Sequence, residues 1–209
     1  MGIVRDFATV SLLIIEDEEH ARSIYRAFLQ PERFRLFFAG NGKEGIQHLE
    51  SCDGIQLPLP DVIISDIMMP EMDGIAVCRS LKAHPVWCHI PVLVASVLSD
   101  NHNIAMALDA GADDYVTKPL GHIELRARIR SMIRQRRQYV LLEQSNVIKD
   151  NILHMVAHDF VRPLDQMGSE LNRLESNVTN RDELDSLRDI MGRMQLSMDD
   201  LRAVLAADN

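Results

Sequence analysis

The strongest constraint on the fold of this chain is a regular alternation of short apolar segments with longer amphipathic stretches. Strands and helices that alternate in this way predict a parallel sheet with helices on both faces. In the first, third and fourth segments Ile, Leu and Val are nearly continuous, which is typical of strands buried on both sides. Turn signals separate the segments at Asn41-Gly42, Asp73-Gly74 and Gly111. The five predicted strands are VSLLII (10–15), FRLFF (34–38), DVIIS (61–65), PVLVAS (91–96) and DYVT (114–117).

Polar residues follow four of these strands: Glu16 and Asp17 the first, Asp66 the third, Ser96 the fourth and Lys118 the fifth. In open parallel sheets ligands bind beyond the carboxyl ends of the strands, so these side chains are expected to converge. Three carboxylates repel one another, and a hard divalent cation such as Mg²⁺ would offset that repulsion. A phosphoryl group on Asp66 would then have the metal and Lys118 to neutralise its oxygens, with Ser96 as a hydrogen-bond donor. A single Asp after a strand is more often a helix cap, but the agreement of four strand ends favours a binding site.

Residues 10 to about 130 resemble the receiver domain of bacterial two-component response regulators. The resemblance is carried by LLIIEDEE, DVIISDIMMPEMDG, IPVLVAS and GADDYVTKP, in that order along the chain. It implies an α/β, flavodoxin-like five-stranded sheet with strand order 2-1-3-4-5, and phosphorylation of Asp66. It also implies a Mg²⁺ ion held by Asp17, Asp66 and the backbone carbonyl of Met68, with Glu16 acting through water.

The same resemblance also assigns the residues that would respond to phosphorylation. Ser96 would be the switch hydroxyl, and Lys118 the phosphate-binding lysine, joined to Pro119 by a cis peptide bond. Tyr115 would be the aromatic residue that turns inward when Ser96 moves toward the phosphoryl group. Two positions depart from the common pattern, Glu16 where Asp is more usual and Ser96 where Thr is more usual. Neither departure changes the expected chemistry.

The second half of the sequence is helical in character. No Gly or Pro occurs between His122 and Pro163, so the last receiver helix is expected to continue without a break. Six arginines lie from Arg126 to Arg137. Because no aromatic residues are interleaved with them, we interpret them as the solvated face of a long helix and not as a nucleic-acid patch. We expect a receiver domain over residues 1–130 and a signalling helix with a helical hairpin over 131–209.

Two runs of apolar residues near the C-terminus advance by alternating steps of three and four. Such seams predict a pair of heptad helices, and Asn180 followed by Glu183 is typical of the capping box that begins the second. Two antiparallel helices with one apolar stripe each cannot enclose a core, so two hairpins are expected to pair as a dimeric four-helix bundle. The runs are Phe160, Leu164, Met167, Leu171, Leu174 and Val178, then Leu184, Leu187, Met191, Met194, Met198, Leu201 and Leu205.

His158 and Asp159 stand next to each other within the first seam helix. His158 is expected to point away from the seam, where a partner domain could reach it. Pro163 cannot donate a hydrogen bond to the Asp159 carbonyl, which permits a bend there. The spacing alone favours an exposed histidine on a dimerisation helix. However, HDFVRPL resembles the phosphoacceptor box of histidine-kinase dimerisation and phosphotransfer domains. By that resemblance His158 is phosphorylated and Asp159 is its acid/base neighbour, while His154 is a weaker candidate.

The composition argues against several other classes of function. The chain carries 22 Lys and Arg against 31 Asp and Glu, a net charge of -9, which disfavours general nucleic-acid binding. No apolar run approaches the roughly 20 residues that span a bilayer, and no signal peptide is evident, so we expect a cytoplasmic protein. The three cysteines lack CxxC spacing and are expected to be reduced. A metal site at His84, Cys88 and His89 is disfavoured.

Three functions remain open at this point. The sequence contains no Gly-rich phosphate loop, so this polypeptide alone is not expected to phosphorylate itself from ATP. We expect the N-terminal part of a receiver-coupled histidine kinase that lacks its ATP-binding domain. One alternative is a complete phosphorelay protein that exchanges phosphate with an upstream kinase or phosphodonor and a downstream receiver or phosphotransfer protein. The other is a receiver whose phosphorylation rearranges a helical dimer that binds another protein.

Overall fold

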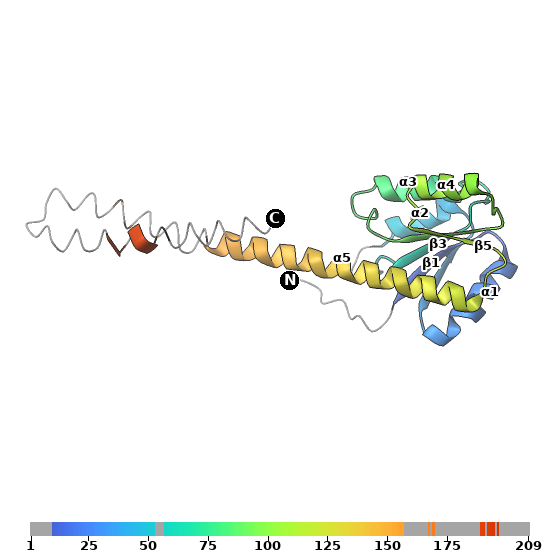
Figure 1. The fold of residues 1–209 in the computed structure, drawn as a ribbon, viewed down its shortest axis with the longest axis horizontal. Coiled ribbons are helices and arrows are strands. Elements are labelled where there is room, and N and C mark those ends of the chain that lie inside the picture. The colour runs from blue at the N-terminus through green and yellow to red at the C-terminus, as the bar shows by residue number, and fades with distance from the viewer. Residues whose placement is uncertain are drawn as a thin grey trace, which may run out of the picture. The chain divides into compact units, whose positions relative to one another are not determined.

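The structure is a computed structural model that describes residues 10–52 and 57–156, together with 167, 169, 189, 190, 192–194 and 196. The chain divides into two compact units, one that ends at Val140 and one that begins at Leu141. The first unit alternates strands and helices as the sequence predicts (Figure 1). Its strands are β1 (Ser11–Ile15), β2 (Arg35–Ala39), β3 (Val62–Ser65), β4 (Val92–Ser96) and β5 (Asp114–Thr117). The helices are α1 (Glu19–Leu29), η1 (Gln30–Glu32), α2 (Gly42–Glu50), α3 (Gly74–Ala83), α4 (Asn101–Asp109) and α5 (His122–Val156).

All five strands are parallel and lie in the order β2-β1-β3-β4-β5. This order confirms the flavodoxin-like topology that the resemblance implied. Helices α2, α3 and α4 cover one face of the sheet, and α1 and the first part of α5 cover the other (Figure 1). A ligand site is therefore expected where β1 and β3, the neighbours at which the strand order reverses, end.

The central strands are buried on both faces, which explains their continuous apolar sequences. Along β1 the side chains alternate, so that Leu13 and Ile15 join the core beneath α2, α3 and α4. Leu12 and Ile14 join the core beneath α1 and α5. All four are fully or almost fully buried. The sequence of β1 is apolar at every position because each face of the sheet carries a helical layer.

The predicted turn signals at Asn41-Gly42 and Asp73-Gly74 are helix starts in the structure. The Asn41 side chain accepts a hydrogen bond from the Glu44 N–H (2.9 Å) and so caps α2. The Asp73 side chain accepts one from the Ala76 N–H (2.7 Å) and so caps α3. Each cap satisfies one of the free N–H groups in the first turn of its helix.

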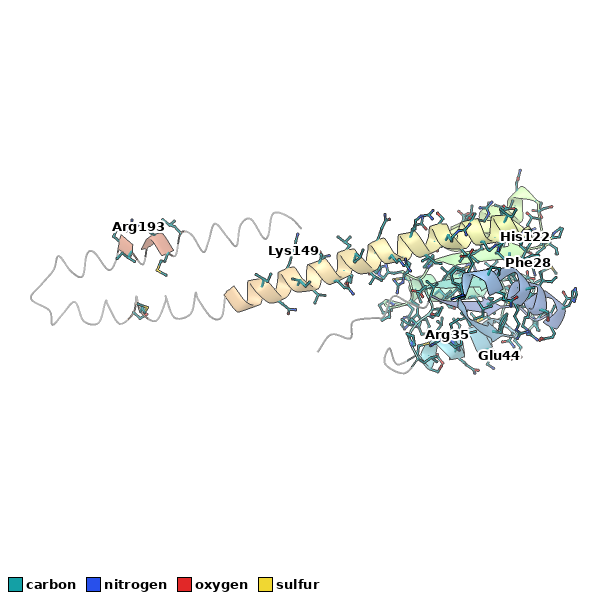
Figure 2. All side chains as sticks on the ribbon, turned by 90° about the horizontal axis from the view of Figure 1, so that it is seen from below. Phe28, Arg35, Glu44, His122, Lys149 and Arg193 are labelled. Carbon is teal, nitrogen blue, oxygen red and sulfur yellow. The ribbon has the colours of Figure 1, made fainter. Side chains whose placement is uncertain are left out.

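Helix α5 runs unbroken over 35 residues, which confirms the continuous helix that the absence of Gly and Pro predicted. Its first part packs on the sheet through Leu125, Ile129, Met132 and Ile133. At its start the ring of His122 lies 5.7 Å from that of Phe28 on α1 (Figure 2).

A second set of contacts fastens α5 close to the end of the first compact unit. The Arg136 guanidinium donates to the His89 carbonyl (3.2 Å), and the His89 ring stacks on Tyr139 with ring centroids 4.1 Å apart. His89 belongs to the segment that leads into β4, so these contacts tie α5 to the amino-terminal edge of the sheet. They explain why the compact unit extends to Val140.

The predicted hairpin lies almost entirely outside the described residues. Of its seam residues the structure describes Met167 and Met194, both helical. His158 and Asp159 lie outside the described part, and the side chain of His154 is not described. The hairpin and the four-helix bundle therefore stay predictions. Among the described helices none combines the length and apolar character that a membrane span requires.

Candidate functional site

The carboxyl ends of β1, β3 and β5 bring four predicted site residues to one pocket. Glu16 and Asp17 follow β1, Asp66 follows β3 and Lys118 follows β5. Together with Met68 they line a pocket of about 600 Å³ at this edge of the sheet. The convergence expected from the strand ends is therefore present for the three carboxylates and the lysine.

Lys118 is the cation that holds this acidic cluster together. Its Nζ lies 2.7 Å from Glu16 Oε2 and also hydrogen-bonds to Asp66 Oδ2. Burial by itself would lower the pKa of Lys118, but its hydrogen bonds to Asp66 and Glu16 raise the pKa above its ordinary value. Burial raises the pKa of Glu16, and the bond to Lys118 counters only part of that effect. In this state of the site one ammonium is shared between two carboxylates and offsets one of their two negative charges. Lys118 is joined to Pro119 by a cis peptide bond, as predicted.

Backbone groups fix the position of Asp66. Its Oδ1 accepts hydrogen bonds from the N–H groups of Ile67 (2.6 Å) and Met68 (3.3 Å), and its own N–H donates to the Ile15 carbonyl (3.0 Å). Gly74, the first residue of α3, lies against this segment, and its N–H donates to the Ile67 carbonyl (3.0 Å). A Cβ atom on Gly74 would lie 2.0 Å from the Asp66 carbonyl oxygen. The close approach of α3 to Asp66 thus requires glycine at position 74.

Ser96 and Tyr115 form a separate polar group beside the pocket. Ser96 is fully buried, and its Oγ accepts a hydrogen bond from the Leu98 N–H (3.3 Å). The Tyr115 side chain is buried, and its hydroxyl donates to the Leu98 carbonyl. Burial raises the pKa of Tyr115. Val97, and not Ser96, belongs to the pocket lining. The structure thus places the two predicted switch residues on neighbouring strands, Ser96 at the end of β4 and Tyr115 in β5, where both contact the backbone of Leu98.

The donor set of the pocket suits a hard divalent cation, because Glu16, Asp17 and Asp66 all supply carboxylate oxygens. However, the part of the chain that the structure describes contains no group of three His, Cys, Asp or Glu side chains already gathered as metal ligands. Instead, Lys118 hydrogen-bonds to the two buried carboxylates, those of Glu16 and Asp66, and Asp17 is exposed. The residue types fit Mg²⁺, and in this arrangement Lys118 supplies the positive charge.

The pocket also has an apolar side that the sequence reasoning missed. Helix α1 contributes Ala21, Ile24, Tyr25 and Phe28, and Leu120 contributes from the segment before α5. A signal was present, because positions 21, 24, 25 and 28 recur at the three- and four-residue steps of one helix face. The position of that face beside the acidic cluster depends on the packing of α1 against the sheet.

Residues 12–130 match the response regulator receiver domain family. The chain belongs to this family. The sequence resembles the KDP operon transcriptional regulatory protein KdpE of Escherichia coli, with 39% identity over 125 residues that cover 60% of this chain and 52% of KdpE. It is 35% identical over 139 residues to a probable transcriptional regulatory protein of Picosynechococcus, covering 66% of this chain and 54% of that protein. The response regulator ArlR of Staphylococcus saprophyticus is 31% identical over 173 residues, 83% of this chain and 74% of ArlR.

A solved structure with a similar fold is the receiver domain of a signal transduction histidine kinase from Syntrophus aciditrophicus. The two share 34% sequence identity with a TM-score of 0.54, over 60% of this chain and 90% of that domain. The chain spans about half the length of the E. coli and Picosynechococcus relatives. The similarity therefore establishes that this chain contains a receiver domain. The regulatory functions given in the relatives' names apply to those proteins.

Proposed function

We propose that this chain is a two-component signalling protein whose receiver accepts a phosphoryl group on Asp66 in a Mg²⁺-dependent reaction. The observation that carries the proposal is the single pocket in which Glu16, Asp17, Asp66 and Lys118 meet at the end of the sheet. Membership of the receiver family implies a kinase or another phosphodonor as the upstream partner. The pocket places a carboxylate nucleophile and a cation side by side, as acyl-phosphate formation requires.

In the proposed reaction a carboxylate oxygen of Asp66 attacks the phosphorus of the donor. The bond between phosphorus and the donor's leaving group breaks, and the leaving group departs with the electron pair. The hydrogen bonds from Ile67 and Met68 hold the carboxylate in place. Lys118 exchanges its bond to Asp66 for one to a phosphoryl oxygen. The ammonium charge then stays next to the negative charge that develops on the phosphoryl group. Asp17, Asp66 and the Met68 carbonyl would hold Mg²⁺, with Glu16 acting through water. When bound, the ion supplies charge neutralisation for the incoming phosphoryl oxygens.

The proposed response of the receiver involves the polar group next to the pocket. Ser96 would turn its hydroxyl toward the phosphoryl oxygens and give up the hydrogen bond from Leu98. Tyr115, which contacts the carbonyl of the same Leu98, would respond to that movement. Because α5 begins just beyond β5, a shift at this edge would reach the long helix.

For the C-terminal segment we propose the histidine phosphotransfer role. His158 would be the phosphoacceptor and Asp159 its acid/base neighbour, in a hairpin that forms a homodimer. The unbroken course of α5 as far as Val156 supports this proposal, since a continuous helix can transmit a shift into the segment that carries His158. Residues 131–209 would then form the signalling helix and hairpin of a receiver-coupled histidine kinase, or of a phosphorelay protein that acts without ATP. A dimerisation switch that binds a partner protein is the alternative.

Phosphorylation by acetyl phosphate tests the proposal. The chain is incubated with labelled acetyl phosphate in the presence of Mg²⁺ or of EDTA, and the Asp66→Asn variant is compared with Asp109→Asn as a matched control on the exposed end of α4. We expect label in the wild type and the control only with Mg²⁺, and none in Asp66→Asn. Equal labelling of Asp66→Asn and the control would contradict the proposal.

The stability of the label separates the two phosphoacceptors. An acyl phosphate is hydrolysed in alkali, whereas phosphohistidine survives alkali and is lost in acid. With a partner phosphotransfer protein present, alkali-stable label that disappears in His158→Gln would support the phosphotransfer role. Unchanged signalling output from His158→Gln would favour the dimerisation switch instead.

A further inference from the structure

The loop between β3 and α3 contains a residue in a strained backbone conformation. Glu71 has a φ of 63°, in the left-handed region that is unfavourable for a residue with a Cβ. Among the described residues Arg33 is the other non-glycine residue with a positive φ, and it ends η1, where that conformation is common. Glu71 ends no helix. Strain of this kind persists only where the surrounding structure holds it, and it is concentrated at functional sites.

The strain belongs to a sharp turn centred on Glu71. The Met72 N–H donates to the Pro70 carbonyl (2.7 Å), so the hydrogen bond encloses a single residue. With a positive φ at its centre, this is the rarer and more strained form of the γ-turn. The arm of the loop that leads into the turn begins at Asp66 and contains Met68, whose N–H donates to Asp66 Oδ1 (3.3 Å). Met68 thus lies between an anchored residue and the turn.

Residues at the start of α2 hold the turn in place. The Gly42 N–H donates to the Met72 carbonyl (3.1 Å), and a Cβ on Gly42 would lie only 2.7 Å from that carbonyl oxygen. The Asn41 Nδ2 donates to Glu71 Oε1 (3.4 Å), and the Lys43 Nζ lies 3.8 Å from Glu71 Oε2. Three consecutive residues at the start of α2 thus contact two consecutive residues of the loop.

Asn41 is itself fixed by its role as the cap of α2. The residue is buried, and its Oδ1 accepts the hydrogen bond from the Glu44 N–H. Its Nδ2 is therefore directed to Glu71 and to the Glu44 carboxylate (3.3 Å). The Gly40 N–H donates to the same carboxylate (2.6 Å) and ties the segment before α2 to the first turn of the helix. The start of α2 is therefore a firm support for the loop.

We propose that Glu71 is a positioning residue for Mg²⁺: the start of α2 holds it in the γ-turn, and the turn keeps the Met68 carbonyl where the metal site needs it. The inference rests on the proposed Mg²⁺-dependent phosphorylation of Asp66. Met68 lines the pocket, whereas Glu71 lies outside the lining and acts through the backbone. Apparent affinity is proportional to the fraction of molecules in the binding-competent conformation, so a loop held in that conformation binds the ion more tightly.

Glycine at position 71 separates positioning from stability. It adopts a positive φ without strain, but it lacks the contacts with Asn41 and Lys43 and also adopts many other conformations. Glu71→Gly should therefore be at least as stable as the wild type, and yet its loop should occupy the competent conformation less often. A side chain with a purely structural role would change stability and leave the affinity for Mg²⁺ unchanged.

A Mg²⁺ titration followed by amide NMR shifts measures the affinity, and urea denaturation in EDTA measures the free energy of unfolding. We expect Glu71→Gly to bind Mg²⁺ severalfold more weakly than the wild type without being less stable in EDTA. The matched control is Glu71→Gln, which loses the same charge but keeps the Cβ and an acceptor for Asn41. This conservative variant should bind Mg²⁺ with nearly the affinity of the wild type.

A second variant perturbs the turn from the side of α2. Asn41→Ser keeps a residue that caps helices well and removes the amide that donates to Glu71. It should weaken Mg²⁺ binding in the wild-type background and have much less effect in Glu71→Gly, because the contact that it removes is already absent there. Equal effects in both backgrounds would overturn the proposed link between Asn41 and Glu71.

The outcomes distinguish this inference from the proposed function. If the wild type binds Mg²⁺ and is labelled at Asp66, and Glu71→Gly binds Mg²⁺ as tightly, the role of Glu71 is wrong while phosphorylation of the receiver stands. Equal weakening in Glu71→Gln would also overturn the inference, because the charge and not the turn would then set the affinity. Lower stability of Glu71→Gly in EDTA would assign the residue a structural role instead. If the wild type neither binds Mg²⁺ nor is labelled at Asp66, both proposals are wrong.

Discussion

Replacing Gly74 with alanine is the sharpest test of how the fold positions Asp66. The added Cβ would lie 2.0 Å from the Asp66 carbonyl oxygen, 2.9 Å from the carbonyl carbon and 3.0 Å from the Ile67 Cα. All three are backbone atoms, so no side-chain rotation can relieve the overlap. To reach ordinary contact, the start of α3 and the segment after β3 must separate by more than about 1 Å.

The magnitude follows from two opposing effects. Overpacking that forces backbone shifts costs typically about 1–3 kcal/mol. Alanine in place of glycine favours a helix by up to about 1 kcal/mol, and Gly74 is the first residue of α3. The steric cost should exceed the gain in helix propensity, because the contact is shorter than those that Cβ atoms make in real structures. We expect Gly74→Ala to lower the free energy of unfolding by about 2 kcal/mol. A displaced Asp66 should also bind beryllofluoride more weakly.

Urea denaturation of the two proteins measures the stability change, and beryllofluoride titration with Mg²⁺ measures the effect on the site. Gly121→Ala is the matched control, since the nearest atom to its added Cβ is the Glu124 Cβ at 3.8 Å, an ordinary contact. The control should stay within about 0.5 kcal/mol of the wild type. If Gly74→Ala proved as stable as the wild type and bound beryllofluoride equally well, the close approach of α3 to Asp66 would not position the site.

Three further predictions follow from the same geometry. Replacing Lys118 with methionine removes the cation between two buried carboxylates. It should lower the free energy of unfolding, measured by urea denaturation, by about 3 kcal/mol. Mg²⁺ should restore part of that loss, and no restoration would argue against the idea that Lys118 and Mg²⁺ both offset the carboxylate charges. The pKa of Lys118 is raised in the folded protein, so its contribution to stability should be complete below pH 10.5 and lost as the pH rises through the folded pKa. The stability difference between the wild type and Lys118→Met should therefore shrink in alkali. A difference that stayed constant would contradict the raised pKa. Glu71 has a positive φ of 63°, so Glu71→Gly should stabilise the protein by up to about 1 kcal/mol, and a loss of stability would show that its side-chain contacts outweigh the backbone strain.

Much of the receiver could be predicted from local sequence because its strands and helices are set by local patterns. The five strands lie within one residue of the predicted segments, since apolar residues at consecutive positions can be buried only between two helical layers. The strand order came from the resemblance and not from the pattern, because no local feature says which strand lies beside which. The hairpin that carries His158 stays a prediction, since it lies outside the described residues.

The sequence predicted which strand ends would meet and not how the side chains at those ends are arranged. The polar residues at the strand ends were expected to meet, and Glu16, Asp17, Asp66 and Lys118 do line one pocket. The hydroxyl of Ser96 instead lies with the loop that holds Leu98. Side chains at strand ends can turn toward several neighbours, and the choice among them depends on contacts that the sequence pattern does not express.

The sequence by itself determined the alternation of strands and helices, the polar edge of the sheet and the unbroken course of α5. Each of these depends on residues close together in the chain. Only the tertiary structure decided that Lys118 bonds to both Glu16 and Asp66 and that Gly74 lies against the Asp66 backbone. It also decided that the Tyr25 hydroxyl is buried with no hydrogen-bond partner among the described residues. Lys118 is 102 residues from Glu16 and 52 from Asp66. Contacts between residues so far apart exist only after the strands have taken their order and the helices have packed on both faces.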